Sequence, residues 1–201
     1  MINMLLIDMD DVIADLQQEW IRRYNKDYND NLDYRKIDLW NIEKHIRPEC
    51  GSKIRDYFKE PTFYFNLKPI DGAIEGIYKI MNILDINKIR ICTYCLWDAV
   101  YGFSEKIMWI EKHIPELRDK VIIAKDKYLL ARHDRILIDD APHNLNEFSQ
   151  FNGTSIVFDK SYNKELPYLR AYDWEHIFNL IKRINSELEF RLREPKIFNS
   201  F

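Results

Sequence analysis

Glycine and cysteine are scarce in this sequence, and each shortage excludes a class of protein. Only 5 of the 201 residues are glycine, and they form neither a P-loop nor a G-x-G-x-x-G nucleotide-binding motif. Only 3 are cysteine, an odd number that does not fit a disulfide framework. Cys92 and Cys95 have the C-x-x-C spacing of redox and zinc sites, but no second pair accompanies them. We therefore expect structural cysteines.

Long apolar runs and an excess of basic charge are also missing. No stretch approaches the ~18 apolar residues of a membrane-spanning helix, and the first residues lack the basic start and apolar run of a secretory signal. The 30 lysines and arginines stand against 33 acidic residues, a net charge of −3 that gives no basic surplus for a nucleic-acid backbone. We therefore expect a cytoplasmic protein with neither membrane nor nucleic acid as a partner.

Hydrophobic residues make up 46% of the chain and aromatic residues 14%, which is enough for one buried core with a smaller attached module. Short apolar stretches alternate with helical patterns such as 71–84 and 103–113. The expected strands lie near residues 4–8, 88–93, 120–124, 135–139 and 154–158. This alternation is typical of an α/β fold, a mostly parallel, Rossmann-like sheet with helices on both faces.

Two pairs of aspartates follow predicted strands and carry the strongest functional signal. Asp8 and Asp10 lie two residues apart, so their side chains share a face and repel each other unless a cation or a turn intervenes. Asp139 and Asp140 follow another apolar strand. Acidic residues are common in turns, but ligands of parallel sheets bind outside the carboxyl ends of the strands, where both pairs fall. The pattern predicts a Mg²⁺ site with one carboxylate left over for catalysis.

Two further strands end in groups that a phosphate site needs. Thr93, a hydroxyl donor, follows the apolar stretch at 88–92, and Lys125 and Lys127 follow the stretch at 120–124. Such donors offset the negative charge of a phosphoryl group. Together the four strand ends resemble the four motifs of the haloacid-dehalogenase-like phosphohydrolases.

Within that superfamily the chain resembles the 5′(3′)-deoxyribonucleotidases from about Met4 to about Phe158. The segments that carry the resemblance, in the family's order, are Glu60–Ala73, Ile91–Thr93, Glu105–Lys106, Trp109–His113, Asp126–Lys127 and Leu137–Asp140. Asp11 stands where the family usually has glycine, but aspartate tolerates a left-handed turn. Tyr94, a predicted substrate contact, stands where the family has a small residue, which leaves the detail of phosphate or sugar recognition open.

The resemblance implies a role for each acidic residue. Asp8 is the nucleophile that forms an aspartyl phosphate, and Asp10 is the general acid and base. By the family pattern, Mg²⁺ is held by the Asp8 carboxylate, the Asp10 backbone carbonyl and the Asp140 carboxylate. Asp139 then lies outside the direct ligands, although spacing alone does not decide between Asp139 and Asp140.

The resemblance also assigns the donor groups. Thr93 and Lys127 are implied in catalysis and in binding the phosphate. Lys125 competes for the lysine role, but the pair Asp126-Lys127 fits the family pattern better, which leaves Lys125 as a substrate contact. The helical, aromatic-rich residues 16–68 look like the small cap that such phosphatases insert, with residues 1–15 and 69–201 as the α/β core. Phe63 and Tyr64 are the cap residues expected to contact a base.

The stretch from about 173 to 193 predicts a helix with an apolar seam. The seam residues are Trp174, Ile177, Ile181, Ile184 and Leu188. We favour packing on the flank of the sheet, because one helix of this length is short for a coiled coil, but a homodimer contact stays open.

These observations predict a Mg²⁺-dependent phosphomonoesterase acting on a nucleoside monophosphate, with a pyrimidine deoxyribonucleotide such as dUMP or dTMP favoured. Two alternatives stay open. The first is a phosphatase of the same mechanism that acts on another small phosphate ester, such as a sugar phosphate. The second is a catalytically silent module that binds a nucleotide, against which the complete set of catalytic groups argues, because a binding module needs neither a nucleophile nor an acid.

Overall fold

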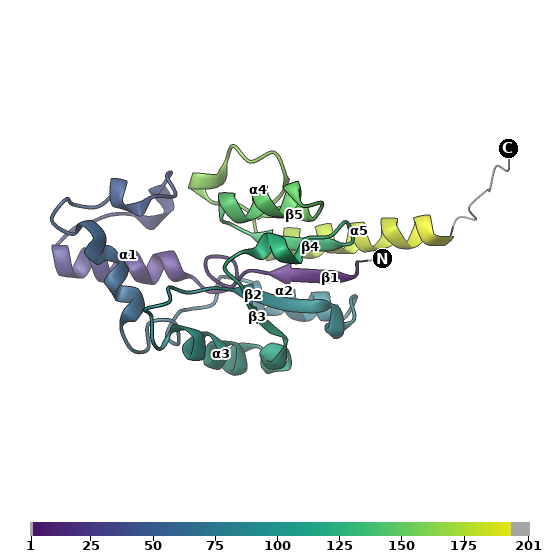
Figure 1. Ribbon diagram of the computed structural model, residues 1–201, viewed down its shortest axis with the longest axis horizontal. Coiled ribbons are helices and arrows are strands. Elements are labelled where there is room, and N and C mark those ends of the chain that lie inside the picture. Colours follow the sequence, from purple (N-terminus) through teal and green to yellow (C-terminus); the bar gives the residue numbers. More distant parts are fainter. Residues whose placement is uncertain (1, 194–201) are drawn as a thin grey trace.

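The computed structural model describes residues 2–193, and the side chains of residues 2–187. Six parallel strands form one sheet in the order β3-β2-β1-β4-β5-β6, as Figure 1 shows in part. The strands are β1 (Met4–Ile7), β2 (Ile89–Thr93), β3 (Val121–Ile123), β4 (Arg135–Asp139), β5 (Thr154–Phe158) and β6 (Leu169–Ala171). The first five agree with the predicted strands. Sequence analysis missed β6, because its three residues, Leu-Arg-Ala, form no apolar run, whereas the equally short β3 lies within the apolar stretch 121–124.

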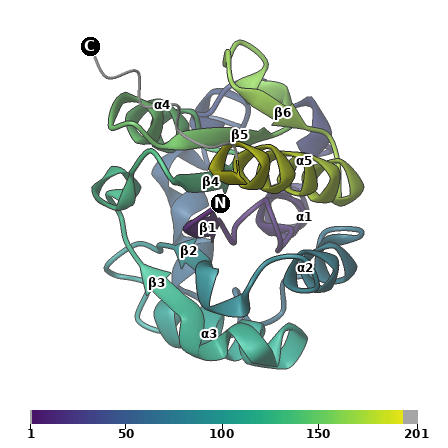
Figure 2. The same ribbon diagram turned by 90° about the vertical axis from the view of Figure 1, so that its right-hand side faces the viewer.

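The described residues form five α-helices, four of which flank the sheet (Figure 1). They are α1 (Leu16–Tyr28), α2 (Ala73–Met81), α3 (Gly102–His113), α4 (Pro142–Gln150) and α5 (Trp174–Arg193). Seen along the sheet in Figure 2, α2 and α5 lie side by side on one face and α4 lies on the other. The expected α/β architecture with helices on both faces is therefore confirmed. Among the described residues, no helix combines the length and the apolar composition needed to cross a membrane.

The central strand β1 has its side chains in two separate cores. Leu5 and Ile7 belong to a large core shared with α2, α3 and α5, whereas Leu6 belongs to a small core with Phe148 of α4. All four side chains are fully buried. Successive side chains of a strand point to opposite faces, so a strand covered on both faces has an apolar residue at every position. The first polar side chain after this strand, Asp8, therefore emerges at the carboxyl edge of the sheet.

The contact between α2 and α5 depends on a glycine. A Cβ atom added to Gly76 would lie 2.7 Å from Cε3 of the Trp174 ring, closer than side chains approach one another. The buried indole of Trp174 also donates from Nε1 to the carbonyl oxygen of Val12, at 2.9 Å. The packing of the two helices thereby fixes part of the loop that follows β1.

The aromatic-rich residues 16–68, called here the helical segment, contain α1 and three short 3₁₀ helices: Tyr34–Lys36, Ile42–Lys44 and Gly51–Lys59. In Figure 1 this segment lies at the end of the sheet toward which the arrow of β1 points. The chain enters and leaves it side by side, since the N–H of Asp15 donates to the carbonyl of Lys68 at 2.8 Å and that of Ile70 to Ile13 at 2.9 Å.

The apolar seam of α5 packs on the chain's own core as far as it is described. Trp174, Ile177 and Ile181 are buried in the large core, and Ile184 packs against its margin. Leu188, the last predicted member, lies outside the residues whose side chains are described. These contacts agree with the favoured packing on the flank of the sheet.

Replacing Gly76 by alanine should lower the free energy of unfolding by about 1–3 kcal/mol, because the added methyl group would displace the Trp174 ring. The direction opposes the preference of helices for alanine over glycine. Urea unfolding of G76A measures the change, with E75A, at an exposed position of the same helix, as the control. A more stable G76A would contradict the close contact.

Candidate active site

The loop after β1 folds back sharply on the strand. The backbone N–H of Ile13 donates to the carbonyl of Met9 at 2.9 Å, which closes one helical turn directly after Asp8. Within it, Asp11 adopts a φ of 56°. The left-handed conformation predicted for this departure from the family pattern is thus confirmed. The turn brings Asp10 back toward the end of the sheet, where it lines the same cavity as Asp8.

Lys127 lies between two of the aspartates. Its Nζ is 2.6 Å from Oδ1 of Asp8 and 2.6 Å from Oδ2 of Asp139, and its side chain is buried. Burial raises the pKa of Asp8 to about 7, although the charge of Lys127 acts in the opposite direction. Burial alone would lower the pKa of Lys127, but Asp139 and Asp8 raise it above its usual value. Lys127 therefore remains a cation that orients the Asp8 carboxylate.

Asp139 and Asp140 have different surroundings. Asp139 accepts hydrogen bonds from Lys127 at 2.6 Å, from the N–H of Ala141 at 2.8 Å and from Nδ2 of Asn144 at 3.0 Å. The Asp140 carboxylate accepts a bond from the hydroxyl of Tyr162. Because its partners already occupy both oxygens, Asp139 has little capacity left for a further ligand.

The acidic residues at the strand ends fit a divalent cation. Asp8, Asp139 and Asp140 each place a carboxylate oxygen within 4.8 Å of the others, and all three are buried. Burial raises the pKa of Asp140 well above its usual value, and the charge of Asp139 raises it further. Lys127 neutralises only part of this charge. Carboxylate oxygens are the ligands that Mg²⁺ prefers, so the donor set suits this ion.

Lys106 of α3 supports the second aspartate. Its Nζ lies 2.5 Å from both carboxylate oxygens of Asp10 and 3.0 Å from Oγ1 of Thr93, with only 1% of the residue exposed. Sequence analysis included Lys106 in a motif but gave it no role. The sequence did indicate that Lys106 is buried, because it shares a helix face with the apolar residues Trp109 and Ile110, which are fully buried in the structure. A lysine on a buried face needs a partner.

Glu105, the residue before Lys106 in α3, binds the backbone at the end of the helical segment through its side chain. Its buried carboxylate accepts hydrogen bonds from the N–H groups of Thr62 at 2.5 Å, Tyr64 at 3.0 Å and Phe65 at 3.4 Å. The ammonium of Lys106 lies 4.6 Å from the centre of the Tyr64 ring. Two consecutive residues of α3 thus contact the helical segment and the loop that follows β1.

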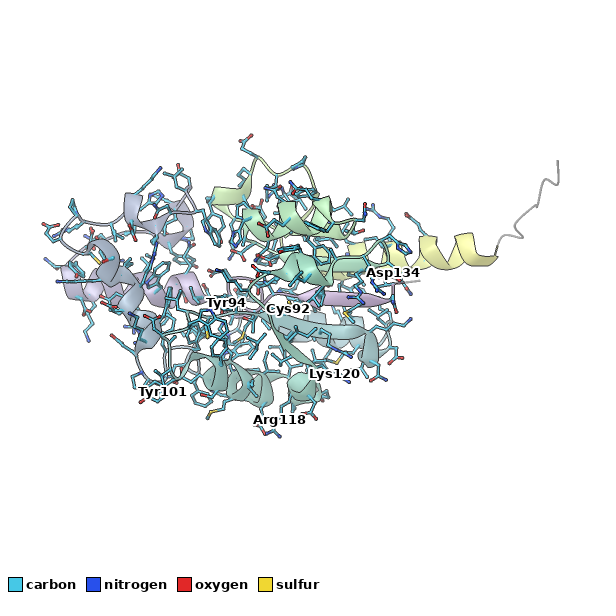
Figure 3. The ribbon with its side chains drawn as sticks, in the orientation of Figure 1. Cys92, Tyr94, Tyr101, Arg118, Lys120 and Asp134 are labelled. Carbon is cyan, nitrogen blue, oxygen red and sulfur yellow. The ribbon has the colours of Figure 1, made fainter. Side chains whose placement is uncertain are left out.

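A cavity of about 490 Å³ lies between the strand ends and the helical segment. The predicted site residues that line it are Asp8, Asp10, Tyr64, Tyr94, Lys125, Lys127 and Asp140. In Figure 3, Tyr94 lies at the edge of the sheet that faces the helical segment. Thr93 and Asp139 are buried behind this lining. Phe63 is fully buried and packs edge-on against Phe58, at 5.3 Å between ring centres, so its ring does not line the cavity.

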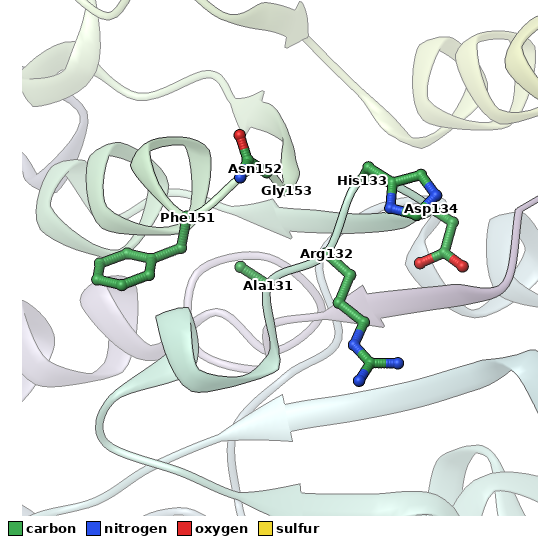
Figure 4. Close-up of a pocket in the computed structure, with 7 residues that line it drawn as sticks. All are labelled: Ala131, Arg132, His133, Asp134, Phe151, Asn152 and Gly153. Carbon is green, nitrogen blue, oxygen red and sulfur yellow. The ribbon is translucent and has the colours of Figure 1, made fainter.

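A second hollow, of about 560 Å³, lies at the opposite ends of the strands. Figure 4 shows its walls, which come from the segments that precede β4 and β5, residues 131–134 and 151–153. It contains none of the predicted site residues. The chemistry-bearing groups therefore gather at the carboxyl ends of the strands, as expected for a parallel sheet.

Comparisons with known proteins agree with this arrangement. A family model described as "5' nucleotidase, deoxy (Pyrimidine), cytosolic type C protein" matches residues 1–187. A protein of Clostridium acetobutylicum named 5'(3')-deoxyribonucleotidase is 37% identical over 175 residues, which are 84% of this chain and 88% of that protein. A human protein named 5'(3')-deoxyribonucleotidase, cytosolic type, is 27% identical over 168 residues, 81% of this chain and 82% of that protein.

Solved structures of low sequence identity share the fold. A haloacid dehalogenase-like hydrolase of Xanthomonas campestris has a TM-score of 0.59 at 13% identity and covers 94% of each chain. A HAD-hydrolase of Bacillus subtilis bound to magnesium has a TM-score of 0.54 at 16% identity, over 90% of this chain and 98% of that one. At such identities the two structures bear on the fold alone, and they support the parallel sheet with helices on both faces.

Replacing Glu105 by glutamine should destabilise the protein by about 2–3 kcal/mol, because an amide group replaces a buried carboxylate that accepts three backbone hydrogen bonds. Chemical unfolding measures the loss. E111Q is the control on the same helix, since Glu111 is exposed and lies 3.5 Å from Arg118 in an ion pair that contributes little. Equal stability of the two variants would contradict the role of Glu105.

Proposed function

Because the chain belongs to the family of cytosolic type C 5′ nucleotidases, the 5′(3′)-deoxyribonucleotidases, we propose that it releases phosphate from nucleoside monophosphates in a Mg²⁺-dependent reaction. The resemblance predicted from the sequence is thereby confirmed at the level of the family, and the chain is a hydrolase with a haloacid-dehalogenase-like fold. We propose pyrimidine deoxyribonucleotides such as dUMP and dTMP as substrates. A cytoplasmic location is proposed from the name of the human cytosolic relative.

The observation that carries the proposal is the pair of aspartates, each held by its own buried lysine, at the floor of one cavity. In the proposed mechanism an oxygen of Asp8 attacks the phosphorus atom, and an aspartyl phosphate forms as the bond to the nucleoside oxygen breaks. Lys127, 2.6 Å from Oδ1 of Asp8, holds this carboxylate in a fixed orientation. Water then attacks the same phosphorus atom, which releases phosphate and restores Asp8.

Asp10 transfers protons in both steps of this mechanism. It gives a proton to the departing nucleoside oxygen and later takes one from the attacking water. Lys106 contacts both Asp10 oxygens at 2.5 Å and limits the positions that the carboxyl group can adopt. Thr93 accepts a hydrogen bond from Lys106 at 3.0 Å, so its own hydroxyl hydrogen is available for a phosphate oxygen.

We propose that Mg²⁺ would be held by the carboxylates of Asp8 and Asp140 and by the backbone carbonyl of Asp10. When bound, it would neutralise charge on the phosphate oxygens as the bonds to phosphorus rearrange. Two observations support these ligands: the three buried carboxylates within 4.8 Å of one another, and the hydrogen bonds that already occupy both oxygens of Asp139. Asp139 then acts by holding Lys127.

The helical segment, residues 16–68, is proposed to act as a cap over the α/β core, of which the structure describes residues 2–15 and 69–193; residues 1 and 194–201 of the expected core lie outside the described residues. The proposal is supported by the cavity, which lies between the two parts and is bounded by aromatic side chains that offer flat apolar surface to a base. They are Trp20, Trp40, Phe58, Tyr64, Tyr94 and Tyr162. Phe63 would act indirectly, by supporting the Phe58 ring. The exposed Lys125 on the same lining is a proposed substrate contact.

Phosphate release from dUMP, dTMP, UMP, dAMP and a sugar phosphate, with Mg²⁺ and with excess chelator, tests the proposed activity. We expect release that needs the metal and favours the deoxypyrimidine nucleotides. Release from the sugar phosphate alone would retain the mechanism and overturn the nucleotide substrate. Binding of nucleotides without any turnover would instead support a silent binding module.

Asparagine at position 8 should reduce turnover by a factor on the order of 10³ or more, because the amide keeps the shape but loses the nucleophilic charge. Circular dichroism checks the fold of D8N. The matched control is D15N, since Asp15 caps α1 and asparagine caps helices equally well. Turnover by D8N at the rate of D15N would exclude Asp8 as the nucleophile.

Asparagine at position 10 should slow the reaction by about 10²–10⁴-fold, the usual contribution of a general acid and base. Rapid quenching with labelled substrate distinguishes the two steps: we expect slow formation of the phosphorylated D10N enzyme and impaired hydrolysis of it. Rapid turnover by D10N would exclude the acid and base role.

A further inference from the structure

Two neighbouring residues that sequence analysis did not identify hold Asp140. They lie in a short 3₁₀ helix, Ser161–Asn163, that follows β5. The hydroxyl of Tyr162 donates a hydrogen bond to Oδ2 of Asp140. Nδ2 of Asn163 donates to the backbone carbonyl of Asp140 at 2.9 Å. The side chain and the backbone of this aspartate are therefore both fixed by one turn of chain.

The same turn contacts the helical segment. The ring of Tyr162 lies edge-on to the indole of Trp40, with 5.4 Å between ring centres and 73° between ring planes. One residue earlier, Oγ of Ser161 donates to the backbone carbonyl of Arg35 at 2.7 Å. The Tyr162 side chain thus touches Asp140 with its hydroxyl and Trp40 with its ring.

The turn itself is held from behind by buried polar contacts. Asn163 is 1% exposed, and its Oδ1 accepts hydrogen bonds from the N–H of Lys160 at 3.0 Å and from the Arg170 guanidinium at 2.9 Å. Arg170 in turn pairs with Asp159 at 2.8 Å. Because the backbone is fixed in this way, the freedom left to Tyr162 is that of its side chain, which Trp40 restricts.

We propose that Tyr162 is a positioning residue for Asp140, and that Trp40 of the helical segment sets where its hydroxyl lies. The hydroxyl binds Oδ2, which leaves Oδ1 of Asp140 as the oxygen that would hold the cation. This inference rests on the proposed function of Asp140 as a Mg²⁺ ligand. Partners that orient a ligand in this manner affect metal affinity by about 10–100-fold.

The test is Mg²⁺ binding to the substrate-free protein, measured by isothermal titration calorimetry. Y162F keeps the ring and its contact with Trp40 but removes the hydroxyl, and we expect its dissociation constant to rise about tenfold. Y168F is the matched control, because the hydroxyl of Tyr168 donates to Asn146 at 2.9 Å in the same part of the chain and has no contact with Asp140. Thermal unfolding without metal confirms that both variants fold.

The contribution of Trp40 is separated by a double-mutant cycle. W40L, at a residue that is 52% exposed, should weaken Mg²⁺ binding about threefold in the wild type, because the Tyr162 ring loses its neighbour. In Y162F the same change should have no further effect, since no hydroxyl remains to be positioned. Additive effects would overturn the role of Trp40.

The outcomes distinguish this inference from the proposed function. Equal dissociation constants for Y162F and Y168F, or no Mg²⁺ binding by the wild type, would overturn the inference even if the wild type releases phosphate from nucleotides. Weaker binding by Y162F alone would uphold it even if no tested nucleotide is hydrolysed, in which case the proposed function would fail instead.

Discussion

Repulsion between buried carboxylates is the constraint on which this site depends. Asp8, Asp139 and Asp140 each place a carboxylate oxygen within 4.8 Å of the others, and burial would favour the neutral forms of Asp8 and Asp140 unless positive charge is brought to them. Lys127 supplies part of that charge from between Asp8 and Asp139. Lys106 does the same for Asp10. The loops after the strands, together with α3 and α4, hold these ammonium groups and carboxylates in fixed positions.

The parallel sheet solves the geometric part of this problem. Strands β1, β2, β3 and β4 end at one edge, so the four loops that follow them bring their polar residues together without long connections. The strands are apolar on both faces, which makes the sheet rigid and confines polar groups to its end. Fixed positions matter because groups that react together must be held at short, defined distances from one another. The hydrogen bond from the Trp174 indole to the carbonyl of Val12 fixes part of the loop after β1 in the same way.

How much of the structure could be predicted from the sequence depends on how far apart the interacting residues lie along the chain. The first five strands lie in apolar runs and the left-handed turn at Asp11 depends on neighbouring residues, so local patterns predicted them. The backbone partners of Glu105 lie 40 to 43 residues away in sequence, Lys106 meets Asp10 across 96 residues, and Tyr162 meets Asp140 across 22 residues. A single sequence carries no record of such pairings. It showed that an aromatic ring was present at Phe63, but not that the ring faces the interior.

The hydrogen bonds that Glu105 accepts from the helical segment bear on which substitutions this protein can tolerate. Glu105 accepts only backbone N–H groups of residues 62–65, and every amino acid except proline supplies such a group. These three hydrogen bonds themselves therefore do not depend on which side chains are present, and residues 16–61 can diverge while the backbone path of residues 62–65 is kept. A segment from a related enzyme could be grafted at residues 16 and 68, provided that its last turn follows the same backbone path. The wall that this segment gives to the cavity could thus change without altering the aspartates and lysines at the strand ends.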